Sequence, residues 1–299
     1  MIATDWCQST RDRAAGSGRT EPTVRQTIKS TSLNYEERGA GVPILNIHGW
    51  PAEHGQMMAM MEPLFERRSN WRRIYLDLPG MGKSAGPDWL VNHDQMLDVV
   101  SDFLDAVAPD QPVVIAGHSY GARLARGLMQ RHGDRVAAAF LLSPGVPSDA
   151  REGAGPPTVF AEDPRFDAAL TETERDVVDL IRVRTLEVLD VLRTQAIPGL
   201  EAADHGFLAR IAAGPDFSYL SAPDRRFPGP VLILSGRQDP GGYLHLCHLL
   251  AAYPRGTCAI LDRTGHLLFA EQPNLLAALA TEWLDRVKEY LRLHAENND

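Results

Sequence analysis

The chain contains few cysteines, no long apolar run and no excess of basic charge, and each absence excludes a class of protein. Cys7, Cys247 and Cys258 are too few for a disulfide framework, and they indicate free thiols in a reducing compartment. No segment approaches the roughly 20 apolar residues that a transmembrane helix needs. The first 20 residues mix charged and small polar side chains, so we expect no signal peptide and a cytoplasmic location.

The charge of the chain is acidic. A formal net charge of −9 without a basic patch argues against nucleic acid and against anionic membranes as partners. With 44% hydrophobic and 23% charged residues, the composition is that of an ordinary globular protein. A chain of 299 residues forms one large α/β domain with an insertion, or two domains. We expect a monomer that acts on a small molecule.

Short apolar runs alternate with amphipathic stretches along most of the chain. Helices are predicted at 56–67, 92–108, 122–131, 243–252 and 274–294. A strand pair is predicted within 24–37, and buried strands are predicted at 44–47, 71–76, 112–116, 137–142, 231–234 and 259–261. This alternation favours an α/β fold with a mostly parallel sheet and helices on both faces.

The domain organisation follows from a change of pattern. Residues 1–22 are predicted to be a loose polar tail, and 23–144 together with 229–299 form the α/β core. Residues 145–228 contain helices without a convincing strand, one from Thr171 or Thr173 through Thr194 and one over 200–213. This segment holds 15 acidic residues and 9 arginines, a balance of −6. We expect it to be a helical cap, or lid, inserted above the site.

The pattern Gly117-His118-Ser119-Tyr120-Gly121 stands between a predicted strand and a predicted helix. On its own G-x-S-x-G means little, because glycine and serine are common in turns. Between a strand and a helix it predicts a nucleophile elbow, in which a sharp, strained turn exposes the serine hydroxyl at the end of the sheet. Ser119 is therefore the candidate nucleophile.

A serine hydroxyl needs a base, and the base needs an acid that orients it. Asp239 follows the predicted strand 231–234, and His266 follows the strand that ends near Leu261. Taken alone, Asp239 reads as a turn residue before proline, and His266 reads as a surface or helix-capping histidine. Their order after Ser119 and their place at strand ends favour a catalytic triad, with His266 as base and Asp239 as its partner.

The segment His48-Gly49-Trp50-Pro51 follows the predicted strand 44–47. Gly49 lets the backbone turn over the elbow, so we expect the amides of Trp50 and Tyr120 to form an oxyanion hole. Both residues, with unspecified cap residues within 145–228, are also the candidate substrate contacts. A buried tryptophan beside a turn is the alternative interpretation of Trp50. His48 is interpreted as a structural hydrogen-bonding residue.

Five motifs in order carry a resemblance to a known fold: H-G-W-P at 48–51, D-L-P-G-M-G-K-S at 77–84, G-H-S-Y-G at 117–121, G-R-Q-D at 236–239 and G-H at 265–266. Together they resemble the α/β-hydrolase fold with a helical cap, over about residues 24–294. The resemblance implies Ser119 as nucleophile, His266 as base, Asp239 as its partner, and no cofactor. Epoxide hydrolases and haloalkane dehalogenases share H-G-x-P and the cap, but they use an aspartate nucleophile where this chain has serine.

More closely, the chain resembles the esterases carried on mobile resistance-gene cassettes, a group that includes macrolide esterases. That resemblance implies a serine esterase that opens the lactone ring of macrolide antibiotics and so confers resistance. A generalist carboxylesterase, a proline-iminopeptidase-like enzyme and a C–C bond hydrolase remain alternatives, and a non-catalytic small-molecule receptor is the alternative from another class.

Two other signals are rejected. Gly82-Lys83-Ser84 resembles the end of a phosphate-binding P-loop, but the first glycine of that motif is replaced by Asp77. His245, Cys247 and His248 are close in sequence but lack a fourth ligand, so we expect no metal site.

Overall fold

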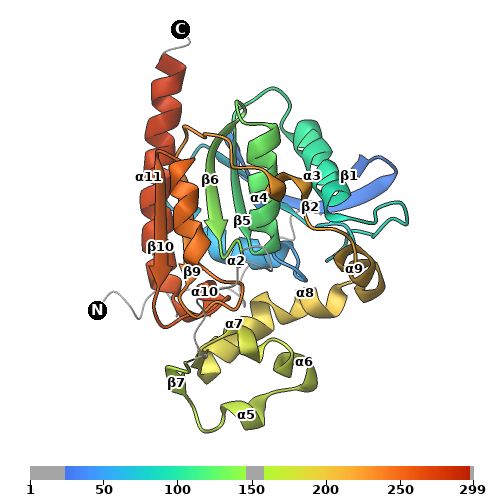
Figure 1. The fold of residues 1–299 in the computed structure, drawn as a ribbon, viewed down its shortest axis with the longest axis vertical. Helices are drawn as coiled ribbons and strands as arrows, with labels where there is room; N and C mark the ends of the chain where they lie inside the picture. Colours follow the sequence, from blue (N-terminus) through green and yellow to red (C-terminus); the bar gives the residue numbers. More distant parts are fainter. Residues whose placement is uncertain (1–23, 146–157, 297–299) are drawn as a thin grey trace.

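The computed structural model describes residues 24–145 and 158–296, so the predicted tail at 1–22 lies outside the described residues. Its centre is an eight-stranded sheet in the order β1-β2-β4-β3-β5-β6-β9-β10 (Figure 1). β2 pairs with β1 and β4 in antiparallel fashion, and every other pair is parallel. The strands are β1 (Val24–Ile28), β2 (Thr31–Arg38), β3 (Val42–Ile47), β4 (Trp71–Leu76), β5 (Val113–His118), β6 (Val136–Leu142), β9 (Val231–Gly236) and β10 (Gly256–Leu261). The predicted α/β class with a mostly parallel sheet is confirmed.

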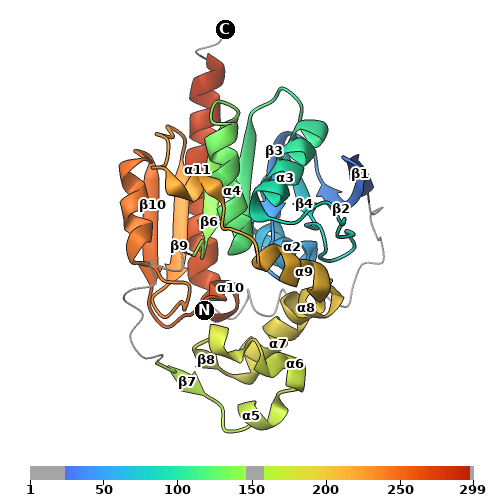
Figure 2. The same ribbon diagram turned by 45° about the vertical axis from the view of Figure 1, so that its right-hand side comes forward.

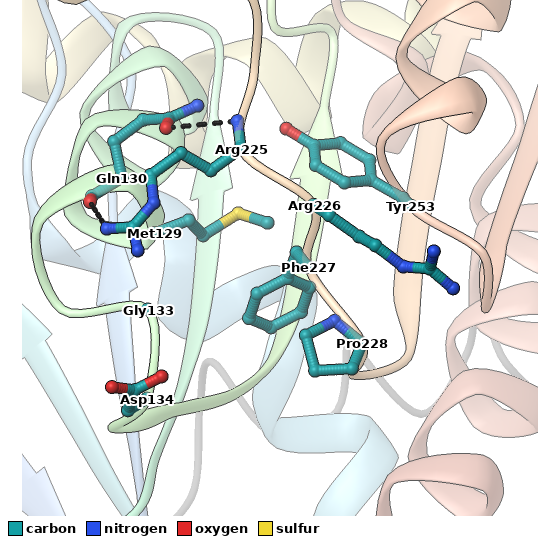
Figure 3. Close-up of a pocket in the computed structure, with 9 residues that line it drawn as sticks. All are labelled: Met129, Gln130, Gly133, Asp134, Arg225, Arg226, Phe227, Pro228 and Tyr253. Atoms are coloured by element: carbon teal, nitrogen blue, oxygen red, sulfur yellow. Dashed lines mark hydrogen bonds between the residues drawn. The ribbon is translucent and has the colours of Figure 1, made fainter.

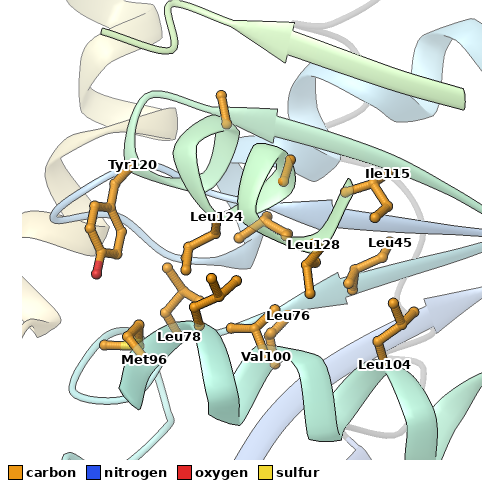
Figure 4. Close-up of a cluster of buried hydrophobic side chains, with 14 of the residues drawn as sticks. Leu45, Leu76, Leu78, Met96, Val100, Leu104, Ile115, Tyr120, Leu124 and Leu128 are labelled. Atoms are coloured by element: carbon orange, nitrogen blue, oxygen red, sulfur yellow. The ribbon is translucent and has the colours of Figure 1, made fainter. Parts of the chain in front are cut away.

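Helices cover both faces of this sheet, as predicted (Figures 1 and 2). α3 (His93–Val107) and α4 (Tyr120–Arg131) pack on one face, and α2 (His54–Phe65) and α11 (Pro273–Glu296) pack on the other. Figure 4 shows the hydrophobic core between the sheet and the first pair of helices, where apolar side chains of α3 and α4 pack against those of β3, β4 and β5. Because both faces are covered, β5 is buried along its whole length, which explains its unbroken apolar run.

Some local predictions need correction. The helix predicted at 243–252 is a 3₁₀ helix, η4 (Leu244–Ala251), and the short helix α10 (Leu268–Glu271) was not predicted. Within the described ranges, no helix combines the length and the apolar composition required to cross a membrane.

Between β6 and β9 the chain leaves the sheet and forms a separate group of helices. Figure 1 shows this group beyond the end of the sheet toward which β6 points. Residues 146–157 of the predicted cap lie outside the described residues. The described helices are α5 (Phe166–Ala169), α6 (Glu172–Arg175), η2 (Val178–Leu180), α7 (Leu186–Gln195), α8 (Ile197–Ala202), α9 (His205–Ala212) and η3 (Ser218–Ser221).

The single helix predicted through Thr194 is wrong, because a turn, the 3₁₀ helix η2 and a short extended stretch separate α6 from α7. There β8 (Val183–Arg184) pairs with β7 (Ala161–Glu162), so the expectation of no strand in this segment is wrong as well. The helix predicted over 200–213 divides into α8 and α9, because the Asp204 carboxylate accepts a hydrogen bond from the Phe207 amide and begins a new helix.

This helical segment rests on loops at the carboxyl ends of the core strands. Phe207 of α9 packs against Gly80 and Gly86, and a Cβ on Gly80 would stand 2.2 Å from the Phe207 ring. The Asp204 amide donates to the Gly80 carbonyl over 2.9 Å. Carboxyl ends of parallel strands are where open α/β sheets place their sites, so the segment covers the edge that carries Ser119.

Candidate active site

Ser119 stands at the turn between β5 and α4. Its backbone φ is 52°, in the left-handed region that a serine adopts only under strain. Gly121 permits this tight turn, because a Cβ there would lie 2.1 Å from the carbonyl oxygen of Ile47. The Ser119 amide donates to the Leu142 carbonyl of the neighbouring strand over 2.8 Å. The strand-serine-helix turn expected from the sequence is therefore present, with the serine held at the end of the sheet.

The structure brings His266 and Asp239 to this serine. The Ser119 hydroxyl lies 2.8 Å from Nε2 of His266, and Nδ1 of His266 lies 2.9 and 3.0 Å from the two carboxylate oxygens of Asp239. Asp239 is fully buried, and its carboxylate also accepts hydrogen bonds from the Gly241 amide at 2.7 Å and the Ser235 hydroxyl at 3.3 Å. The base is thus hydrogen-bonded to both partners at once.

Charge coupling sets the protonation of these groups. Burial lowers the pKa of His266, but the charge of Asp239 and its hydrogen bond raise the pKa more, so it lies above its ordinary value. Burial raises the pKa of Asp239, but His266 lowers it more, so the net direction is downward. Asp239 is therefore a carboxylate at neutral pH, suited to stabilise the cation that His266 becomes when it takes a proton.

Two further histidines lie close to the elbow without competing as bases. Burial, and then the charge of His266, lower the pKa of His118 to about 3, so its ring is neutral. His48 is fully buried; its Nδ1 donates to the Gly49 carbonyl and its Nε2 accepts from the Leu78 amide. Both nitrogens of His48 are occupied by backbone groups, which agrees with the structural role expected for it.

The turn that carries Trp50 passes directly over the elbow. A Cβ on Gly49 would lie 3.4 Å from the Cβ of Ser119, and the Trp50 ring packs edge-on against Tyr120 with centroids 4.8 Å apart. The Trp50–Pro51 peptide is cis. Tyr120 is the first residue of α4, so its amide has no acceptor within the helix. The structure therefore brings Trp50 and Tyr120 beside Ser119, and their role as oxyanion donors stays a prediction.

Gln56 is a residue of the site that sequence reasoning missed. It is buried in the first turn of α2, and its Oε1 lies 3.0 Å from the Gly49 amide and 3.1 Å from Nδ1 of His118. It thereby ties the turn before Trp50 to the strand before Ser119. Nothing in the sequence distinguished this glutamine from the first polar residue of a predicted helix.

An aromatic cluster joins the elbow to the segment above it. The Tyr120 hydroxyl donates to Nδ1 of His93 over 2.8 Å, and the Phe217 ring lies 5.5 Å from Tyr120 and 5.2 Å from His93. Burial lowers the pKa of His93, which keeps that nitrogen available as an acceptor. Asp216, the residue before Phe217, forms an ion pair with Arg123 of α4, and this pair holds the Phe217 ring beside Tyr120. One wall of the site beside Trp50 is therefore aromatic.

The rejected P-loop segment has a different function in the structure. Its turn closes on Asp77, whose buried carboxylate accepts hydrogen bonds from the Lys83 amide at 3.0 Å and the Asn34 side chain at 2.7 Å. A carboxylate stands where a phosphate would bind, and the two anions would repel each other.

His54, Glu53 and Asp77 are the acidic and histidine groups placed closely enough to share an ion among the described residues, whereas His245 and Cys247 are not in such a group. Burial lowers the pKa of His54, but hydrogen bonds from its ring to Asp77 and Glu53 raise the pKa to about 10. At neutral pH the His54 ring is therefore a cation that is paired with the Glu53 and Asp77 carboxylates.

A small pocket lies away from this site. It has a volume of about 50 Å³ and is found at the end of α4 opposite Ser119 (Figure 3). Phe227 and Tyr253 stand across from Met129 in it, and Gln130 is hydrogen-bonded to Arg225. Neither Ser119, Asp239 nor His266 is among the residues that line this pocket.

Comparison with known proteins shows which family the sequence matches. A family profile described as the alpha/beta hydrolase family matches residues 45–279, more than half of the chain. Two curated relatives are each 33% identical. They are the AB hydrolase superfamily protein YisY of Bacillus subtilis (strain 168), over 41% of this chain and 45% of that protein, and the 2-hydroxy-6-oxo-6-(2'-aminophenyl)hexa-2,4-dienoic acid hydrolase of Metapseudomonas resinovorans, over 36% and 37%.

The chain therefore matches less than half the length of each of these curated relatives. Among solved structures, an alpha/beta superfamily hydrolase from Oenococcus oeni PSU-1 is similar over 89% of this chain and 99% of its own, with a TM-score of 0.81 and 24% identity. At that identity the likeness is one of fold.

Proposed function

The chain belongs to the alpha/beta hydrolase family, and we propose that it is a serine hydrolase that cleaves carboxylic esters through an acyl-enzyme. The observation that carries this proposal is the continuous hydrogen-bonded chain from the Ser119 hydroxyl through His266 to Asp239, with 2.8 and 2.9 Å steps, at a strained strand-helix turn. The strained backbone of Ser119 and the buried carboxylate of Asp239 occur at the same site, and both features are typical of functional sites.

The mechanism follows from the positions of the atoms. The Ser119 hydroxyl attacks the ester carbonyl while Nε2 of His266 takes its proton, and Asp239 holds the imidazole in the tautomer that leaves Nε2 free. The amides of Trp50 and Tyr120 bind the oxyanion. His266 then returns the proton to the leaving alcohol, and it activates a water that hydrolyses the acyl-enzyme.

We propose a macrolide lactone as the substrate, selected by residues 145–228 acting as a cap. Two features support this choice: the resemblance of the motifs to resistance-cassette esterases, and the acidic balance of −6 in that segment, which suits a neutral or cationic ligand such as a macrolide with a dimethylamino sugar. In a lactone the acyl and alcohol parts remain one molecule, so hydrolysis opens the ring and adds one water.

Replacing Ser119 with alanine tests the nucleophile. We expect ester turnover to fall about 10⁵–10⁶-fold and covalent labelling by a fluorophosphonate to disappear. The matched control is S69A, at an exposed serine in the loop before β4, which should keep full activity. Retained turnover in S119A would refute the mechanism.

The substrate is tested separately, by mass spectrometry of macrolides incubated with the wild-type enzyme. We expect a product heavier by one water with wild-type enzyme and none with S119A. If simple esters are hydrolysed but no macrolide gains a water, the esterase proposal stands and the macrolide proposal fails.

A C–C bond hydrolase is the second candidate, favoured by one observation. The Metapseudomonas resinovorans relative named for a dienoic acid substrate is 33% identical over 110 residues. A conjugated dienoate loses its absorbance when the carbon–carbon bond is hydrolysed, so a spectrophotometric assay beside a short acyl ester separates the two functions.

A further inference from the structure

Glu271 is a buried carboxylate that the proposed catalysis does not use. It ends α10, five residues after His266, and it is 9% exposed. One of its oxygens accepts hydrogen bonds from the amides of Arg182 and Val183, the latter at 2.9 Å. The other accepts from the Thr264 hydroxyl at 2.8 Å and the Gly265 amide at 2.7 Å.

These four donors come from two separate segments. Thr264 and Gly265 immediately precede His266, whereas Arg182 and Val183 belong to the cap at the start of β8. Each carboxylate oxygen serves one segment, so the side chain of Glu271 bridges the cap and the loop of the base.

Two independent contacts join the same segments. The His266 amide donates to the Leu180 carbonyl over 2.8 Å, and a Cβ on Gly265 would stand 2.3 Å from that same carbonyl oxygen. The core holds the other side of the loop, since the Ser143 hydroxyl donates to the His266 carbonyl over 3.1 Å. The peptide of His266 is therefore held between the cap and the core.

The chemistry of the bridge requires a carboxylate. All four partners are N–H or O–H donors, and only an ionised carboxylate offers acceptors on both atoms without a donor of its own. The guanidinium of Arg182 is not the partner, because it donates to the carbonyls of Asp179 and Ile181. Burial raises the pKa of Glu271 and the hydrogen bonds from the four donors lower it, with a net direction above the ordinary value.

We propose that Glu271 is a positioning residue that couples the cap to the base: it fixes the His266 loop in its reactive position by docking the segment Leu180–Val183 onto that loop. The inference rests on the proposed function, because it assumes that His266 is the base. In this arrangement the cap holds the base in place, in addition to any contact it makes with the substrate.

The test is E271Q. The amide nitrogen of glutamine cannot accept from a backbone N–H, so the bridge loses its hydrogen bond to Gly265 in one orientation of the amide and those to Arg182 and Val183 in the other. We expect the rate constant for labelling of Ser119 by a small fluorophosphonate, and kcat for a short acyl ester, to fall about 10–100-fold. KM should change much less, because a small ester does not depend on the cap for binding.

Three further variants are compared with E271Q. E271D keeps the charge and both acceptor oxygens but is shorter by one methylene, so it should lose less of the rate than E271Q. T264V removes one of the four donors without changing the shape of the side chain, and should cost a smaller, severalfold part of it. E282Q, the same substitution at an exposed position of α11, should match wild type. If E271Q does not fold, T264V and E271D still test the proposal.

The result that overturns the proposal is folded E271Q, or T264V where E271Q does not fold, labelled at the wild-type rate while the wild type itself is labelled. A loss confined to low or high pH with an unchanged plateau would also overturn it, because the effect would then be electrostatic. Failure of the proposed function looks different: wild-type Ser119 would neither be labelled nor turn over any ester.

Discussion

Replacing Asp239 with asparagine changes one atom of the site and should reverse the tautomer of the base. The Gly241 amide donates to Oδ1 of Asp239 over 2.7 Å, so in the variant the amide oxygen is held at that position. The amide nitrogen then stands at Oδ2, 3.0 Å from Nδ1 of His266, and donates to it in competition with the amide oxygen, which stays 2.9 Å from the same Nδ1. The proton of His266 moves to Nε2, which can no longer accept the proton of Ser119.

The expected loss in kcat is about 10⁴-fold, by analogy with the aspartate-to-asparagine exchange in other Ser-His-Asp hydrolases, or about 5.5 kcal/mol in the activation barrier. The pH profile should change too. In the proposed mechanism neutral His266 is the base, so we expect activity to be lost as the pH falls through the pKa of His266. Since the charge of Asp239 raises that pKa, its removal moves the acid limb to lower pH.

The assay is hydrolysis of a short acyl ester across pH 5–9 with wild type, D239N and S235A. S235A loses only the 3.3 Å hydrogen bond to Asp239, and it should keep activity within about tenfold of wild type. Thermal unfolding shows whether D239N remains folded. Folded D239N with more than a tenth of wild-type kcat, or with an unmoved acid limb, would refute the assignment of Asp239.

Two further predictions concern groups outside the triad. The pKa of His54, raised to about 10 by Asp77 and Glu53 in spite of burial, gives stability that is complete below pH 6.5 and is lost as the pH rises toward 10. The difference in free energy of unfolding between wild type and H54Q should therefore shrink by roughly 2–4 kcal/mol over that range in urea denaturation, and a constant difference would contradict it. Cys247 and Cys258 have sulfurs 3.6 Å apart, so a diazene oxidant should join them with loss of two hydrogens in wild type and not in C247S; an unchanged mass after treatment would count against it.

The elbow and the fold class could be predicted because their signals are local. Ser119 stands between a fully buried strand and a helix, and the sharp turn requires the small neighbours that the pentapeptide shows. The proximity of Asp239 and His266 to Ser119 could be predicted because carboxyl ends of parallel strands share one edge, so topology brings together residues that are far apart in sequence.

The cap could not be predicted to the same depth, because its conformation depends on distant partners. The pattern from Thr171 to Thr194 is helical in its apolar spacing, yet the amides of Arg182 and Val183 bond to Glu271, almost 90 residues away. A helix through this stretch would have kept those amides within itself. Tertiary hydrogen bonds outweighed local propensity, and a single sequence gives no sign of such a partner.

Three glycines in the core loops are nevertheless sites where the helical segment packs closely, although in the sequence they resemble ordinary turn residues. Gly80 and Gly86 stand where the Phe207 ring packs, and Gly265 stands where the Leu180 carbonyl passes. Gly80 and Gly86 follow β4, and Gly265 follows β10. The sheet order places these two strands on opposite sides of β5, the strand that precedes Ser119. The cap is thus anchored on both flanks of Ser119. If this segment selects the substrate as proposed, we expect substitutions that alter substrate choice to fall between the two anchors, because a change at an anchor would also disturb the contact of Glu271 with the His266 loop.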